Sequence, residues 1–189
     1  MDAINGAGGE RPRRKGNRDG TGQRPGGRSP VPVLPLGTPL YGALDLGTNN
    51  CRLLIAAPSD TGFVVVDAFS RIVRLGERLS HSGRLHDQAM TRTIEALRVC
   101  ANKLKWRNVQ RIRLVATEAC RTAGNGVEFL ARVEAETGLR LEVIDRETEA
   151  LLAATGAEPL AAPGADTVLV FDIGGGSTEI MWMAKTGEH

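Results

Sequence analysis

The chain has 189 residues, enough for one domain of ordinary size and part of another. Hydrophobic residues make up 41% of it but aromatic residues only 4%, so a packed core must be mainly aliphatic. The net charge of +2 does not indicate a nucleic-acid-binding protein, and no apolar run approaches the roughly 18 residues that a membrane span needs.

Residues 1–30 differ from the rest of the chain in charge and composition. They carry seven Arg or Lys against three Asp or Glu, a net charge of +4, so the remaining residues sum to −2. The segment is rich in Gly, Pro and Arg, and its few apolar residues cannot offset the entropy lost on ordering. We therefore expect residues 1–40 to form a disordered basic extension. The pair Arg13-Arg14 is not followed by an unbroken apolar run, which argues against an export signal.

The three cysteines, Cys51, Cys100 and Cys120, are odd in number and widely spaced. Without an export signal, they indicate reduced thiols in a cytoplasmic protein. The histidines show no zinc-ligand spacing with them, so we do not expect a transition-metal site.

The first elements follow from short apolar runs between turn residues, which predict strands over residues 41–46, 51–57 and 63–69. Because their loops are too short for a crossover, these strands must be antiparallel neighbours. Apolar residues then recur at steps of four and three, which predicts a helix with one buried face over residues 87–105.

Strands and helices alternate over the rest of the chain, at residues 111–117 (strand), 125–138 (helix), 141–144 (strand), 146–156 (helix), 167–173 (strand) and 178–184 (strand). Asn125 and Glu128 resemble a capping box at the start of the first of these helices, and Gly138 is suited to its C-cap.

This order predicts the fold class. Helical crossovers imply parallel pairing, so the three antiparallel strands should continue into a mixed five-stranded sheet with flanking helices. That is the α/β, ribonuclease H-like arrangement, the unit duplicated in the actin–sugar kinase superfamily. We expect residues 41–157 to form the first such domain, residues 158–166 a linker, and residues 167–189 the start of a truncated second domain.

The expected second domain begins with one hairpin. Its edges would be unpaired and its apolar face would have no partner layer. We expect this hairpin to be poorly ordered, to self-associate, or to pack on a further segment.

One pattern occurs twice, 127 residues apart. Each copy has an Asp near the end of an apolar strand and a Gly-rich turn, Asp45-Leu-Gly-Thr-Asn-Asn50 and Asp172-Ile-Gly-Gly-Gly-Ser177. Glycines let a backbone approach a ligand closely, and successive turn N–H groups can converge on an anion. The Asp suits a hydrated Mg²⁺ better than the phosphate itself. Two facing copies would hold a phosphate chain from both sides. The alternative interpretation is that each copy is only a tight hairpin turn without a ligand.

Four segments together resemble the exopolyphosphatase / guanosine pentaphosphate phosphohydrolase (Ppx/GppA) family, at residues 43–50, 115–121, 146–150 and 170–179. They occur in the family's order and spacing, and the resemblance covers about residues 41–184. Sugar kinases share the two phosphate loops but not the middle two segments.

The resemblance implies roles for the matching positions. Glu149 corresponds to the catalytic base, with Glu118 as the fallback base. Phosphate would be bound by Gly47, Thr48, Asn49, Asn50, Arg121, Gly174, Gly175, Gly176 and Ser177, and the cofactor Mg²⁺ by Asp45 and Asp172. From the residues alone, Arg121 could also be a solvated side chain in a polar loop, and Glu149 an acidic residue of a first helical turn that complements the helix dipole. Leu151 stands where the family usually has a basic residue.

The function that the resemblance implies is hydrolysis of the terminal phosphoanhydride of inorganic polyphosphate or guanosine pentaphosphate, by a water that Glu149 activates. The two phosphate-binding loops would serve either substrate, so the sequence does not choose between them. The resemblance also implies that the full-length protein could form a homodimer, as family members often do. Two alternatives stay open: an ATP-dependent small-molecule kinase or ATPase of the same superfamily, and a non-catalytic polyphosphate- or nucleotide-binding fragment.

Overall fold

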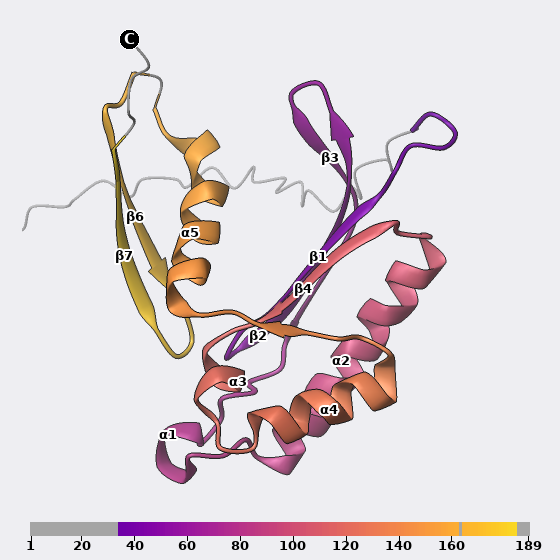
Figure 1. The fold of residues 1–189 in the computed structure, drawn as a ribbon, viewed down its shortest axis with the longest axis vertical. Coiled ribbons are helices and arrows are strands. Elements are labelled where there is room, and N and C mark those ends of the chain that lie inside the picture. Colours follow the sequence, from indigo (N-terminus) through magenta and orange to yellow (C-terminus); the bar gives the residue numbers. More distant parts are fainter. Residues whose placement is uncertain (1–33, 163, 185–189) are drawn as a thin grey trace, which may run out of the picture. The chain divides into compact units, whose positions relative to one another are not determined.

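The computed structural model describes residues 34–162 and 164–184 (Figure 1). The predicted basic extension lies, up to residue 33, outside the described residues. The elements are, in chain order, β1 (Tyr41–Leu46), β2 (Asn50–Ser59), β3 (Gly62–Ile72), α1 (Leu79–Ser82), α2 (Asp87–Trp106), β4 (Arg111–Ala116), α3 (Glu118–Thr122), α4 (Gly126–Thr137), β5 (Glu142–Val143), α5 (Arg146–Ala157), the 3-10 turn η1 (Glu158–Leu160), β6 (Thr167–Ile173) and β7 (Thr178–Ala184).

The first five strands form one mixed sheet in the order β3-β2-β1-β4-β5. β1, β2 and β3 are antiparallel neighbours joined by tight turns, whereas β4 and β5 add to β1 in parallel. The predicted ribonuclease H-like sheet with flanking helices is therefore confirmed, and it brings the carboxyl ends of β1 and β4 to the same edge.

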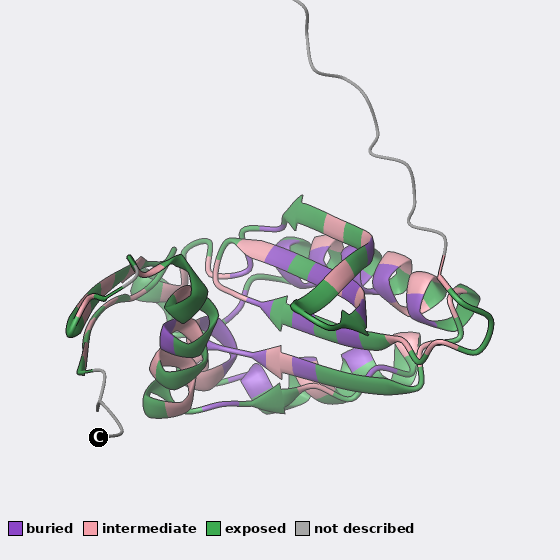
Figure 2. Cartoon of the chain, turned by 90° about the horizontal axis from the view of Figure 1, so that it is seen from above, coloured by how far each residue is buried: buried purple, intermediate pink, exposed green. Residues whose placement is uncertain are grey.

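One face of this sheet carries the core. Along β1 buried and exposed residues alternate, so Leu44 and Leu46 point into the core while Tyr41 and Asp45 lie on the other face (Figure 2). α2 and α4 supply the opposing layer, with fully buried side chains such as Phe129 (Figure 1). Each large aliphatic side chain buried here stabilises the fold by about 1.5–3 kcal/mol.

The local predictions need three corrections. Asn125 precedes α4 but makes no side-chain capping bond. Its buried amide instead accepts from the N–H of Leu85 at 2.7 Å and donates to the same residue's carbonyl at 3.1 Å, so the capping-box prediction is wrong. The short helices α1 and α3 were not predicted, because four- and five-residue helices give no periodic signal. β5 has two residues instead of the expected four.

β6 and β7 form a separate two-stranded antiparallel ribbon. One of its faces carries Val168 and Met183 and packs against α5, so the expected lack of any partner layer is wrong for this face. The other face carries large apolar residues that are exposed, namely Leu169, Phe171, Ile173, Ile180 and Trp182. Among the described residues, no helix is both long enough and apolar enough to cross a membrane.

Candidate active site

The first Gly-rich loop, residues 47–50, closes the β1–β2 hairpin. Leu46 pairs with Cys51, and the N–H of Gly47 donates to the carbonyl of Asn50 at 2.9 Å. The loop therefore lies at the end of the central strand, directly above the buried core.

The second Gly-rich loop, residues 174–177, repeats this geometry between β6 and β7. Ile173 pairs with Thr178, and the N–H of Gly174 donates to the carbonyl of Ser177, again at 2.9 Å. The similarity seen in the sequence is thus also a similarity of turn geometry.

The two loops touch each other. A Cβ placed on Gly176 would lie 2.8 Å from Oγ1 of Thr48, and one placed on Gly175 would collide with the side chain of Asn49. A Cβ at either position would force the neighbouring side chain or the loop to shift, since real Cβ atoms essentially never come so close to another heavy atom.

A polar cavity of about 260 Å³ lies at this contact. It is lined by nearly every residue predicted for the site, namely Asp45, Gly47, Thr48, Asn49, Asn50, Glu118, Glu149, Asp172, Gly174, Gly175, Gly176 and Ser177. Among the predicted site residues within the described part of the chain, Arg121 alone does not line it.

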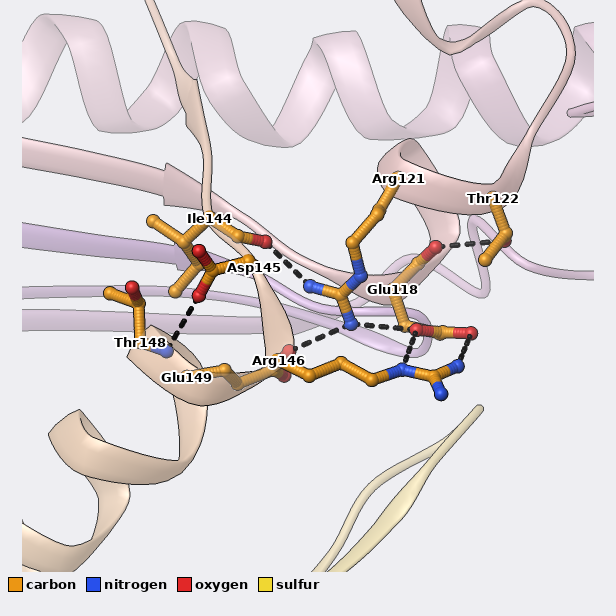
Figure 3. Close-up of polar contacts among 8 residues, drawn as sticks. All are labelled: Glu118, Arg121, Thr122, Ile144, Asp145, Arg146, Thr148 and Glu149. Atoms are coloured by element: carbon orange, nitrogen blue, oxygen red, sulfur yellow. Dashed lines mark hydrogen bonds and ion pairs between the residues drawn. The ribbon is translucent and has the colours of Figure 1, made fainter.

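Arg121 lies beside the cavity and holds two of its carboxylates (Figure 3). Its Nη2 donates to Oε2 of Glu118 at 2.6 Å and to Oε2 of Glu149 at 3.1 Å. Its Nη1 donates to the carbonyl of Ile144 at 2.6 Å, which fixes the guanidinium plane. All three side chains are less than one-fifth exposed, so these charges attract each other in a partly desolvated setting.

The position of Glu149 depends on the start of α5. Asp145 caps this helix: its Oδ1 accepts from the N–H of Thr148 at 2.7 Å, and this bond holds the pKa of the Asp145 carboxyl below its usual value (Figure 3). Glu149 is in the first turn, so the cap sets its direction toward the cavity.

Glu118 is bound by a second arginine. Nη2 of Arg146 donates to Oε1 of Glu118 at 3.0 Å, while Arg121 holds Oε2 (Figure 3). Partial burial by itself would raise the pKa of Glu118, but the bonds and charges of the two guanidinium groups outweigh it and lower the pKa. Glu118 is therefore a weak base with both oxygens engaged.

Besides Thr117 and Ile173, two charged lining residues, Arg52 and Glu179, were missed by the sequence reasoning. Each is the direct cross-strand partner of a predicted aspartate: Asp45 pairs with Arg52, and Asp172 with Glu179. The signal was present in the sequence, because a four-residue hairpin loop fixes this register and both residues are charges in otherwise apolar strands.

The cavity also suits a divalent cation. Asp45, Glu118, Glu149, Asp172 and Glu179 all line it, and among the residues described no three metal-binding side chains form a complete site. Burial raises the pKa of Asp45; Arg52 opposes this shift, and the carboxylates of Glu149 and Asp172 add to it. Such a donor set fits Mg²⁺, which binds through one or two carboxylates, waters and substrate phosphate oxygens.

The class of fold is a ribonuclease H-like sheet followed by a second Gly-rich hairpin, whose loop meets the first Gly-rich loop. Comparison with known proteins identifies the family: the chain belongs to the Ppx/GppA phosphatase family, whose model matches residues 54–188. The predicted family resemblance is confirmed.

Solved structures agree with this assignment. The Aquifex aeolicus PPX-GPPA enzyme is 36% identical with a TM-score of 0.69, over 77% of this chain and 48% of that one. An exopolyphosphatase from Cytophaga hutchinsonii is 30% identical with a TM-score of 0.72, over 78% and 47%. The chain thus spans about half the length of these relatives.

Proposed function

We propose that this chain carries the phosphate-binding and water-activating part of a phosphohydrolase that removes the terminal phosphoryl group of inorganic polyphosphate or guanosine pentaphosphate. The observation that carries the proposal is the shared cavity, into which both Gly-rich loops and the carboxylate of Glu149 project. Family membership supports it, because relatives with the same fold include an exopolyphosphatase.

Glu149 is the proposed general base. Its Oε2 accepts from Arg121, but its Oε1 has no hydrogen-bond partner among the described residues and can accept a proton from water. Glu118 has no such free oxygen, because two arginines hold its carboxylate. The structure thus supports the choice of Glu149 over the fallback base Glu118.

The hydrogen bonds of Arg121 support a positioning role. Binding of phosphate by Arg121 stays a prediction; two of its nitrogens already hold Glu118, Glu149 and the backbone. We propose that it orients the base, while N–H groups and polar side chains of loops 47–50 and 174–177 bind the phosphoryl oxygens. Arg52 is the cation that lines the cavity beside them.

Asp45 and Asp172 would hold Mg²⁺ together with the phosphate. When bound, the metal would neutralise the leaving phosphate, which five lining carboxylates would otherwise repel. Each aspartate is the next-to-last residue of its strand, one position before the strand meets a Gly-rich loop, which supports a cation site beside the proposed phosphate site.

Glu149→Gln tests the base. The amide keeps the shape of the side chain but cannot take a proton, so we expect phosphate release to fall by about 10²–10⁴-fold while binding of tripolyphosphate is retained. Glu147→Gln is the matched control, because Glu147 is exposed in the same helical turn and does not line the cavity. Phosphate release from polyphosphate and from guanosine pentaphosphate, with and without Mg²⁺, is the measurement.

Other outcomes would contradict the proposal in distinct ways. Binding without phosphate release in both the parent and the variant, with Mg²⁺ present, would indicate a binding module. Transfer of phosphate from ATP to an acceptor would indicate a kinase. Unequal rates of phosphate release from polyphosphate and guanosine pentaphosphate would agree with the proposal and identify the preferred substrate.

A further inference from the structure

Residues 73–77, which directly follow β3, support the first Gly-rich loop through backbone hydrogen bonds; we call this segment the brace. The N–H groups of Val73 and Arg74 both donate to the carbonyl of Asn49, at 2.8 and 3.0 Å. The N–H of Gly76 donates to the carbonyl of Thr48 at 3.0 Å. Two successive loop carbonyls are therefore turned toward the brace, which directs the remaining loop groups toward the cavity.

The backbone of the brace is under constraint. Arg74 has a φ of 48°, in the left-handed region, which costs a residue with a Cβ about 1–2 kcal/mol. Gly76 has no room for a side chain, because a Cβ there would collide with Cγ2 of Thr48. Such a conformation persists only where neighbouring contacts hold it.

Arg92 of α2 supplies those contacts. Its Nε donates to the carbonyl of Val73 at 2.7 Å, and its Nη2 approaches the carbonyl of Arg74 at 3.4 Å. The same Nη2 pairs with Glu77 at 3.2 Å, at the far end of the brace. One guanidinium thus contacts three of the five residues of the brace, from a helix packed on the core.

We propose that Arg92 is a positioning residue for phosphate binding: through the brace it fixes loop 47–50 in the conformation that receives the phosphoryl oxygens. Arg92 does not line the phosphate cavity, so its effect passes through the backbone. Preorganised donors bind a phosphate without first paying the entropy of ordering a loop. The inference rests on the proposed function, because it takes loop 47–50 as the phosphate site.

The experiment compares Arg92→Gln and Arg92→Lys with the parent chain. Arg98→Gln is the control, since Arg98 lies on the same helix but pairs with Glu136, away from the brace. Two quantities are measured: amide hydrogen exchange, residue by residue, and binding of inorganic tripolyphosphate with Mg²⁺ by titration calorimetry.

In Arg92→Gln we expect the amides of Val73, Arg74 and Gly76 to exchange about tenfold faster, while those of β1 and β4 keep the parent rates. Tripolyphosphate binding should weaken about tenfold or more, in line with other residues that orient a binding group. Arg92→Lys should recover part of both effects through one remaining donor, and Arg98→Gln should change neither.

Equal acceleration of exchange across β1, β4 and the brace would overturn the inference, because Arg92 would then act only on global stability. So would unchanged exchange in the brace, or faster exchange there with unchanged tripolyphosphate affinity. If the parent does not bind tripolyphosphate at all, the proposed function fails, whereas the exchange data still decide whether Arg92 holds the brace.

Discussion

The two Gly-rich loops have the same turn but different supports. Loop 47–50 joins strands of the five-stranded sheet, is hydrogen-bonded by the brace, and lies over a core closed by α2 and α4. Loop 174–177 joins two strands with no fully buried residue along their length, which α5 covers on one face. Loop 47–50 is thus fixed by hydrogen bonds from the brace and by the core beneath it, whereas loop 174–177 is supported where Gly175 and Gly176 meet loop 47–50.

The loops also differ in charge. The aspartate before the first loop has Arg52 as its cross-strand partner, and the aspartate before the second has Glu179. The same turn therefore lies in two different electrostatic environments: charges of both signs flank loop 47–50, whereas two negative charges flank loop 174–177. Under the proposed function, Arg52 would lower the repulsion of phosphoryl oxygens beside loop 47–50, whereas Glu179 would add to the negative charge that attracts the cation shared by Asp45 and Asp172.

Hydrogen exchange should show the largest difference between the two supports. We expect amides in β1 and β4 to exchange about 100-fold or more slowly than those in β6 and β7, because the ribbon can open without exposing the aliphatic core. Residue-resolved exchange on the parent chain measures this. Equal protection in the two regions would contradict the contrast between them.

Gly176→Ala should break the contact between the loops. Its Cβ would lie 2.8 Å from Thr48 Oγ1 and 3.3 Å from Glu118 Cγ, so these two side chains must shift or the loops must separate. We expect tripolyphosphate affinity to fall about 10–100-fold with the fold retained, as judged by calorimetry and circular dichroism.

Gly156→Ala is the control for that change. A Cβ at this position in α5 meets no atom within 4 Å, so the substitution should leave affinity unchanged and stabilise the helix by about 0.5–1 kcal/mol. Parent-like affinity in Gly176→Ala would mean that close contact between the loops is not needed for binding.

Asp67→Asn tests the sheet that supports the first loop. Asp67 is only 12% exposed and accepts from Lys103 at 2.8 Å and from Arg107 at 3.3 Å, which ties β3 to α2. Losing its charge should lower the free energy of unfolding by about 1–3 kcal/mol at neutral pH, measured by urea denaturation. Glu128→Gln, in the exposed 3.6 Å pair with Arg84, should change it by about 0.5 kcal/mol or less.

The same variant gives a signed pH prediction. Partial burial would raise the pKa of Asp67, but the bonds from Lys103 and Arg107 hold it below its usual 3.8. A depressed folded-state pKa stabilises the protein above the unfolded value and loses that contribution as pH falls through the folded value. The parent should therefore lose stability below about pH 4 more steeply than Asp67→Asn. Parallel stability curves would contradict this.

Arg52→Gln should sharpen the difference in charge between the loops. Without Arg52, the surroundings of loop 47–50 lose their lining cation beside Asp45 and become negative, like those of loop 174–177. We therefore expect tripolyphosphate binding to weaken about five- to tenfold and to depend less on salt. Arg113→Gln is the control, because Arg113 pairs with Glu142 outside this cavity. Equal effects of the two substitutions would indicate only a general loss of positive charge.

Features encoded by neighbouring residues were predictable. The three-strand meander, the helical crossovers and the two Gly-rich turns follow from local pattern, and Gly138 does end α4 in the left-handed conformation, at φ 71°. The position of Arg52 opposite Asp45 also follows from the length of the hairpin loop.

Features that depend on distant partners were not predictable. Asn125 was expected to cap α4, but its amide is used by Leu85, 40 positions away. Phosphate binding by Arg121 stays a prediction; its bond to Glu118 is local, but the bond to Glu149 spans 28 positions and could not be anticipated from the sequence. The bonds between Arg92 and the brace likewise exist only after α2 has packed. Side chains with several donors take the partners that tertiary structure offers, which a linear pattern does not specify.

An NMR titration shows whether both Gly-rich loops bind one phosphate chain. Tripolyphosphate with Mg²⁺ is added to the ¹⁵N-labelled chain, and the backbone amide signals of residues 47–50 and 174–177 are followed. We expect both sets of signals to shift with a single dissociation constant. Shifts confined to one loop, or two clearly different constants, would contradict this expectation.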